Sequence, residues 1–119
     1  METIQQERSH YLNGGSDMLA RCVTALLANE TTGTTFMPCR HFSRLQGTCF
    51  ADQGGTLYID FSGDGSNVDY TRTLSISAND TATSAWDQLI PSPYVRFRYT
   101  NGAVAQGAFR FYAYGKAVS

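Results

Sequence analysis

Charged residues are scarce in this sequence, and lysine is almost missing. Charged residues make up 16% of the 119 residues, and a single Lys is present. Nine basic residues are balanced by ten acidic ones, which gives a net charge of -1. Binding to nucleic acid irrespective of its sequence depends on an excess of Lys and Arg. We therefore expect no nucleic-acid partner.

Long hydrophobic runs are also missing. The longest apolar run, residues 22–28, is interrupted by Thr24, whereas a helix needs about 20 apolar residues to span a bilayer. Residues 1–17 are polar and lack the cationic stretch and apolar core of a secretory signal. We therefore expect no contact with a membrane and synthesis in the cytoplasm.

Cysteine and histidine are too few for most catalytic or metal sites. Cys22, Cys39 and Cys49 are odd in number and show no Cys-x-x-Cys spacing, which indicates buried reduced thiols. The two His are His10 and His41, and only His41 lies near a Cys in the sequence. Because no usual zinc spacing or nucleotide-binding glycine motif occurs, we predict no metal, no cofactor and no enzymatic activity.

The residues that are abundant favour strands and turns. Thirteen Thr, seven Phe and seven Tyr suit a pleated, half-buried surface. Apolar and polar residues alternate over 57–62, 70–78, 95–100 and 109–114, which is the pattern of a strand with one buried face. Two further strands are expected, and their ranges are 40–51 and 85–89.

Turn residues predict how these strands connect. Asp64-Gly65 is typical of a hairpin between 57–62 and 70–78, and Asn101-Gly102 of a hairpin between 95–100 and 109–114. Asp60 to Gly65 also resembles the opening of a calcium loop, but Thr71 stands where a bidentate Glu is needed, so we favour the turn.

The N-terminal third is harder to assign. Residues 18–28 are compatible with a helix capped by Asp17, but their Cys-Val-Thr centre favours a first strand. Residues 1–17 are too polar to bury a core of their own, so they form either a frayed terminus or an arm that orders on a neighbour. We predict an extended arm over 1–17 and, over 18–119, an all-β, single antiparallel β-sandwich, jelly-roll-like, with seven to eight strands.

The predicted last hairpin carries the most suggestive surface. Its outward face would present five side chains, with Arg72 nearby: Arg96, Arg98, Arg110, Tyr112 and Tyr114. Arg and Tyr are enriched in protein contact surfaces. An ordinary solvated sheet face, a nucleic-acid surface and a glycan surface are the alternatives. Trp86 is expected in the core.

Three segments resemble a small β-sandwich domain that recurs in virion proteins of tailed bacteriophages. They are Thr56 to Ser66, Pro93 to Gly102 and Gly107 to Phe111. The resemblance implies a structural protein and is greatest to capsid cement, or decoration, proteins. Such proteins commonly sit on the capsid exterior as trimers and brace the shell with an N-terminal extension.

The resemblance therefore implies a protein that binds the phage major capsid protein, as a homo-oligomer with a trimer favoured, and stabilises the shell through its arm and one sandwich edge. In the arm, the candidate contact residues are Ile4, Arg8, Tyr11 and Leu12. One alternative is a tail-associated receptor- or carbohydrate-binding module, with aromatic candidates Tyr58, Tyr70, Trp86, Tyr112 and Tyr114. The other is a small enzyme, which would need His41 or a carboxylate pair in a pocket.

Overall fold

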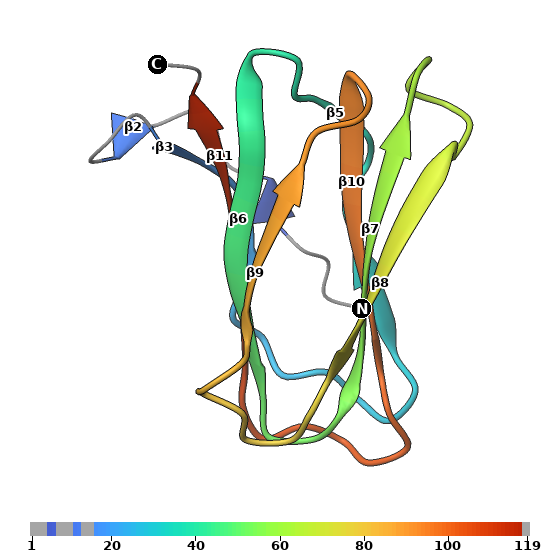
Figure 1. Ribbon diagram of the computed structural model, residues 1–119. Coiled ribbons are helices and arrows are strands. Elements are labelled where there is room, and N and C mark those ends of the chain that lie inside the picture. Colours follow the sequence, from blue (N-terminus) through green and yellow to red (C-terminus); the bar gives the residue numbers. More distant parts are fainter. Residues whose placement is uncertain (1–4, 7–10, 13–15, 118–119) are drawn as a thin grey trace.

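The computed structural model describes residues 5–6, 11–12 and 16–117, which form two antiparallel β-sheets facing each other (Figure 1). Sheet A has the order β1-β3-β11-β6-β9, with β2 also paired to β3. Its strands are β1 (Gln5–Gln6), β2 (Tyr11–Leu12), β3 (Ser16–Cys22), β6 (Phe42–Ala51), β9 (Ala85–Leu89) and β11 (Phe109–Ala117). Sheet B has the order β4-β10-β7-β8, with β5 also paired to β10. Its strands are β4 (Thr31–Gly33), β5 (Met37–Pro38), β7 (Gly55–Ser62), β8 (Tyr70–Ile76) and β10 (Tyr94–Asn101).

The predicted all-β sandwich is confirmed. Within the described residues, seven strands have five or more residues, and four short strands of two or three residues complete the sheets. No helix in this part of the chain has the length and apolar character needed to cross a membrane.

Alternation along the strands builds the core between the sheets. In β10, Val95, Phe97 and Tyr99 are fully buried, while the residues between them are half-buried on the outer face. The rings of Phe97 and Phe111 lie 5.5 Å apart across the two sheets. Trp86 is 6% exposed and contacts both of them, so its predicted place in the core is confirmed.

The predicted hairpin between β7 and β8 is confirmed, with Leu57 opposite Leu74. Gly65 has a φ of 81°, a conformation that glycine adopts without steric cost. The Asp64 carboxylate accepts hydrogen bonds from the backbone N–H groups of Ser66 and Asn67, both within 2.9 Å. These bonds lower the pKa of Asp64. The carboxylate therefore holds the turn, as the hairpin interpretation requires.

The predicted hairpin between β10 and β11 is wrong, because these strands lie in different sheets. Neither Asn101 nor Gly102 adopts the positive φ of a tight hairpin turn. Instead the Asn101 side chain is buried, and its Nδ2 donates to the carbonyl oxygens of Leu27 and Val104, both at 2.9 Å. The chain then crosses over and enters sheet A at Phe109, so Asn-Gly here begins a crossover between sheets.

The strand expected over 18–28 is confirmed as far as Cys22, where β3 ends. Beyond it the chain leaves the sheet. The Leu26 N–H donates to Gln106 Oε1, and the Gln106 N–H donates to the Leu26 carbonyl. This reciprocal pair satisfies the backbone of the loop without a strand partner.

The N-terminal segments extend sheet A where the structure describes them. Gln5 lies opposite Arg21, and Tyr11 lies opposite Asp17, both in antiparallel pairing with β3. Because β3 begins at Ser16, the predicted boundary between residues 17 and 18 falls within this strand. The predicted role of residues 1–17 as a binding arm stays a prediction.

Candidate functional site

The split of β10 and β11 between two sheets divides the predicted Arg-Tyr surface. Arg96 and Arg98 lie on the outer face of sheet B, where Arg96 pairs with Asp60 of β7. Arg110, Tyr112 and Tyr114 lie on the outer face of sheet A. The two groups therefore face away from each other on opposite sides of the sandwich and cannot contact one flat partner surface together.

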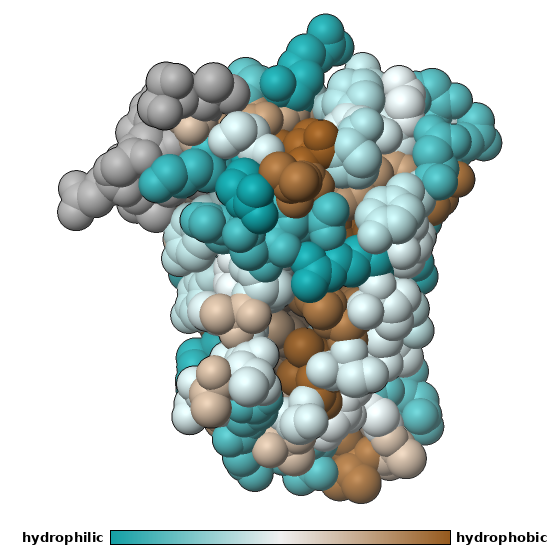
Figure 2. All heavy atoms as spheres, in the orientation of Figure 1, coloured by the Kyte–Doolittle hydropathy of each residue, from teal (hydrophilic) through white to brown (hydrophobic). Residues whose placement is uncertain are grey.

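Arg72 joins neither group. It lies opposite Ile59, whose side chain points into the core. Its guanidinium donates to the Asp87 carbonyl and to Gln88 Oε1 of β9. Arg72 thus links β8 and β9, which are edge strands of the two sheets. Figure 2 shows separate hydrophobic patches, divided by hydrophilic surface, along this side of the sandwich.

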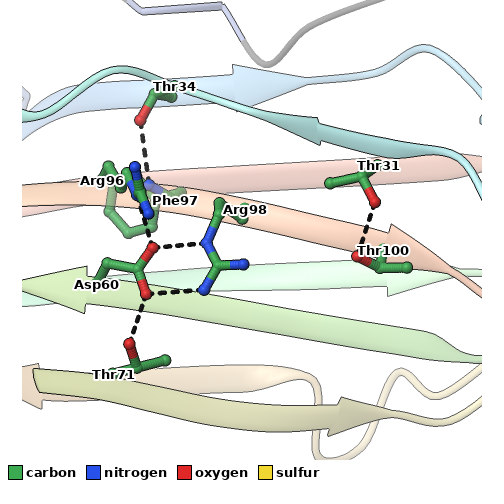
Figure 3. A network of polar contacts seen from close by, with 8 residues as sticks. All are labelled: Thr31, Thr34, Asp60, Thr71, Arg96, Phe97, Arg98 and Thr100. Atoms are coloured by element: carbon green, nitrogen blue, oxygen red, sulfur yellow. Dashed lines mark hydrogen bonds and ion pairs between the residues drawn. The ribbon is translucent and has the colours of Figure 1, made fainter. Parts of the chain in front are cut away.

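The most organised polar group is a network on the outer face of sheet B (Figure 3). Its centre is Asp60, which is completely buried although it lies on the outward side of β7. Asp60 Oδ2 accepts from Nε of Arg96 at 2.7 Å and Nε of Arg98 at 2.6 Å. Oδ1 accepts from Arg98 Nη2 at 3.0 Å and from Thr71 Oγ1 at 2.7 Å. Each carboxylate oxygen therefore has two donors, which fills its usual acceptor capacity.

This arrangement keeps Asp60 ionised. Burial acts to raise the pKa of Asp60, but the hydrogen bonds from Arg98, Thr71 and Arg96 outweigh it and lower the pKa to about 2. Hydrogen bonding to Asp60 also raises the pKa of Arg98. One carboxylate and two guanidiniums therefore leave a net charge of one positive unit on this network near neutral pH.

Each of the two guanidiniums also lies over an aromatic ring. The Arg96 Cζ atom lies 4.7 Å from the centre of the Phe36 ring, and the Arg98 Cζ atom lies 4.5 Å from the centre of the Tyr58 ring. Both distances are typical of cation–π contacts. The side chains of Arg96 and Arg98 are 31% and 35% exposed, so both arginines are fixed in position yet open to solvent.

The outer face of sheet A has a simpler arrangement. Arg110 lies opposite Phe50, and its Cζ atom is 4.3 Å from the centre of the Phe50 ring. Tyr112 and Tyr114 are half-buried and pair with Thr48 and Gln46 of β6. This face combines one cation with two aromatic side chains.

The residues considered for catalysis and metal binding are not brought together. In the part of the chain that the structure describes, no group of three or more His, Cys, Asp or Glu could hold a metal ion. His41 is exposed in the turn before β6, with its ring 4.5 Å from that of Phe42. A depression of about 300 Å³ lies beside this turn. Its lining contains neither histidine nor carboxylate; it consists of Arg40, Phe42, Ile90, Pro91, Ser92 and Pro93.

The three cysteines are buried, as predicted. Burial raises the pKa of Cys39 to about 11. Burial, with a smaller effect of Cys22, raises the pKa of Cys49 to about 12. Thiols with such pKa values are poor nucleophiles and poor metal ligands near neutral pH.

The candidate aromatic residues for glycan binding are dispersed. Trp86 lies in the core, Tyr58 and Tyr70 belong to sheet B, and Tyr112 and Tyr114 belong to sheet A. In the arm, Tyr11 and Leu12 form β2, whereas Ile4 and Arg8 lie outside the described residues.

Asp60 is the functional candidate that sequence reasoning missed, because the segment Asp60 to Gly65 predicts a turn and not a polar site. The available signal was its position between Ile59 and Phe61 in an alternating strand, where a carboxylate must find donors on the neighbouring strands. Arg96 and Arg98 are two residues apart on β10, so both side chains lie on the outer face of sheet B.

Comparison with known proteins places the chain in a family and beside a solved fold. The model of the family described as "Uncharacterised protein YqxG N-terminal domain" matches residues 7–116. The uncharacterized protein YqxG of Bacillus subtilis (strain 168) is 34% identical over 70 residues, which are 59% of this chain and 23% of YqxG. The phage-like element PBSX protein XepA of the same strain is 38% identical over 71 residues, 59% of this chain and 25% of XepA.

The chain therefore spans about a quarter of the length of these two relatives in the matched regions. The crystal structure of PBSX exported protein XepA matches with a TM-score of 0.73 at 22% sequence identity, over 99% of this chain and 46% of the XepA chain. At this identity the structural match shows a shared fold.

Proposed function

Because this chain belongs to the YqxG N-terminal domain family, whose model matches residues 7–116, we propose that it is a non-enzymatic structural protein of a phage or phage-like particle. The observation that carries the proposal is the likeness to XepA, a protein of the phage-like element PBSX, in sequence and across nearly the whole fold. The described candidate catalytic residues offer no assembled acid-base or nucleophile-base pair.

The more specific role that we propose is that of a capsid cement protein, which binds the major capsid protein on the exterior of the shell. A cement subunit stabilises a shell by adding interface area across neighbouring capsid subunits, so several modest contacts act together through avidity. Three surfaces support such contacts. They are the Arg-aromatic face of sheet B, the Arg-Tyr face of sheet A, and the edge of sheet A formed by β1 and β2.

The direct test uses particles from a phage or phage-like element whose copy of this gene is deleted. The purified chain is mixed with these particles, the particles are pelleted, and bound copies are counted. The cement role predicts saturable binding at hundreds of copies for each particle, and a higher temperature of shell disruption. Particles that bind no chain would contradict the cement role. Binding of the chain to the tail alone would support the tail-associated receptor- or carbohydrate-binding module instead.

A truncated chain tests the arm within the same assay. Removal of residues 1–12 takes away β1 and β2 but leaves β3 complete, since β3 begins at Ser16. The expected result is a folded domain with the Trp86 fluorescence of the full chain and strongly reduced binding to particles. Unchanged binding would show that the arm is dispensable.

A further inference from the structure

The strands of sheet B carry one net positive charge on their outer face. Its five strands contain four charged residues, and one of them, Arg72, points toward the core side. The other three are Asp60, Arg96 and Arg98, which together leave one unit of positive charge. The neighbouring outward residues are uncharged, and they include Thr31, Thr73 and Thr100.

The guanidiniums keep donors that Asp60 does not use. The Asp60 carboxylate accepts hydrogen bonds from Nε of Arg96 and from Nε and Nη2 of Arg98. Among the described residues, no acceptor is bonded to Nη1 or Nη2 of Arg96 or to Nη1 of Arg98. Because the carboxylate of Asp60 already has four donors, it has little capacity to bind a further cation.

The network also holds these donor groups in fixed positions before a partner binds. Binding an anion with a flexible arginine costs the conformational entropy of that side chain. Here each guanidinium is already held between a buried carboxylate and an aromatic ring, Phe36 for Arg96 and Tyr58 for Arg98. The donors are thus ordered before a partner arrives, and part of that cost is removed.

We propose that this face is a docking surface for an acidic segment of a protein partner, with an Asp or Glu carboxylate bound by the terminal nitrogens of Arg96 and Arg98. The identification of that partner as a particle protein rests on the proposed function. Charge complementarity favours the carboxylate, because guanidinium groups bind carboxylates in paired, charge-assisted hydrogen bonds. One excess charge among threonine and tyrosine side chains suits a protein segment, whereas a nucleic acid requires a row of cations along its phosphates.

The test follows the backbone amide signals of the ¹⁵N-labelled chain during titration with a blocked acidic heptapeptide, GEEDEEG. Its uncharged counterpart, GQQNQQG, is titrated in parallel. The proposal predicts that the acidic peptide alone shifts signals of β7 and β10, and that the shifts decrease as salt is raised. Equal shifts from both peptides, or no shift on sheet B at millimolar acidic peptide, would overturn it.

Two arginine variants separate this site from general charge attraction. In Arg96→Gln, Asp60 keeps its bonds from Arg98 and Thr71, so the fold is expected to persist and the amide spectrum verifies it. Its affinity for the acidic peptide should fall about tenfold, the effect of losing one charge-assisted contact. Arg110→Gln removes the same charge and a similar contact with an aromatic ring, but on the opposite face. It should bind as the unmodified chain does, and an equal loss in both variants would refute the site.

Titration with a phosphate compound tests whether the arginines bind phosphate in place of a carboxylate. Inorganic pyrophosphate that shifts the same signals where the acidic peptide does not would overturn the proposal in favour of a phosphate ligand. The peptide assay needs no particle, so its failure is distinct from failure of the proposed function. Peptide binding without particle binding would refute only the particle role, and particle binding without peptide binding would refute only the docking surface.

Discussion

Replacement of Asp60 by Asn gives the sharpest test of how the sheet B network contributes to stability. Hydrogen bonds from Arg98, Thr71 and Arg96 overcome the effect of burial and lower the pKa of Asp60 from 3.8 to about 2. One pKa unit corresponds to about 1.4 kcal/mol, so the ionised carboxylate contributes about 2 kcal/mol to the free energy of unfolding at neutral pH. Asp60→Asn should lose about this amount at pH 7.

The pH dependence provides the internal check. Because the folded-state pKa of Asp60 is the lower one, its contribution is present above about pH 4 and is lost as the pH falls toward about 2. The difference between the unmodified chain and Asp60→Asn should therefore be constant from pH 7 to pH 5 and shrink below pH 4. Other aspartates with lowered pKa values, such as Asp64 and Asp87, occur in both proteins and cancel in the difference.

Urea unfolding followed by the fluorescence of Trp86 measures this difference. Trp86 is the single tryptophan, and it is packed against Phe97 and Phe111, so its emission reports on the core between the sheets. Asp69→Asn is the matched control, because Asp69 is exposed and accepts from the Gly63 N–H, a bond that an Asn oxygen can keep. Its expected effect is below about 0.5 kcal/mol. A loss for Asp60→Asn that is as large at pH 2 as at pH 7 would refute the ionised network as its cause.

Three further predictions, two on substitutions and one on thiol reactivity, test the core and the loops. Gly47→Ala should lower the free energy of unfolding by about 1–3 kcal/mol, measured by urea unfolding, because a Cβ atom there would overlap the Trp86 ring and the Tyr112 carbonyl. The buried thiols of Cys39 and Cys49, with pKa values of about 11 and 12, should react with a disulfide reagent at pH 8 only after urea is added; rapid reaction of the folded chain would contradict their burial. Asn101→Ala removes the donor that holds two loop carbonyls and should speed proteolytic cleavage of the β10–β11 connection.

Much of the fold follows from residue alternation. Leu57, Ile59 and Phe61 have the period of two that places one face of a strand in a core, and the structure buries all three. The β9 strand also has the predicted bounds, Ala85–Leu89. These features depend on interactions within a strand or between neighbours in the chain, so the local sequence contains the information.

The pairing of β10 with β7 instead of β11 could not be read from local sequence. Asn101-Gly102 has the composition of a hairpin turn. However, the Asn101 side-chain amide donates a hydrogen bond to the Leu27 carbonyl in the loop that follows β3, more than 70 residues away. A turn propensity worth a fraction of a kcal/mol is easily outweighed by several buried hydrogen bonds. The same limit applies to Asp60, whose donors come from β8 and β10. Its role depends on which strands become neighbours.

The corrected topology changes what the arginines can do together. In a β10–β11 hairpin, Arg96, Arg98 and Arg110 would have formed one basic surface for one partner. In the sandwich, Arg96 and Arg98 share the buried Asp60, whereas Arg110 stands over Phe50 on the opposite outer face. A partner seated on sheet B therefore leaves the face of sheet A uncovered, and each face can be altered without touching the other. Arg110→Gln is therefore a clean control for Arg96→Gln, because it changes only the face of sheet A. The same separation leaves one subunit with two outer faces for two different neighbours, which the proposed cement role requires.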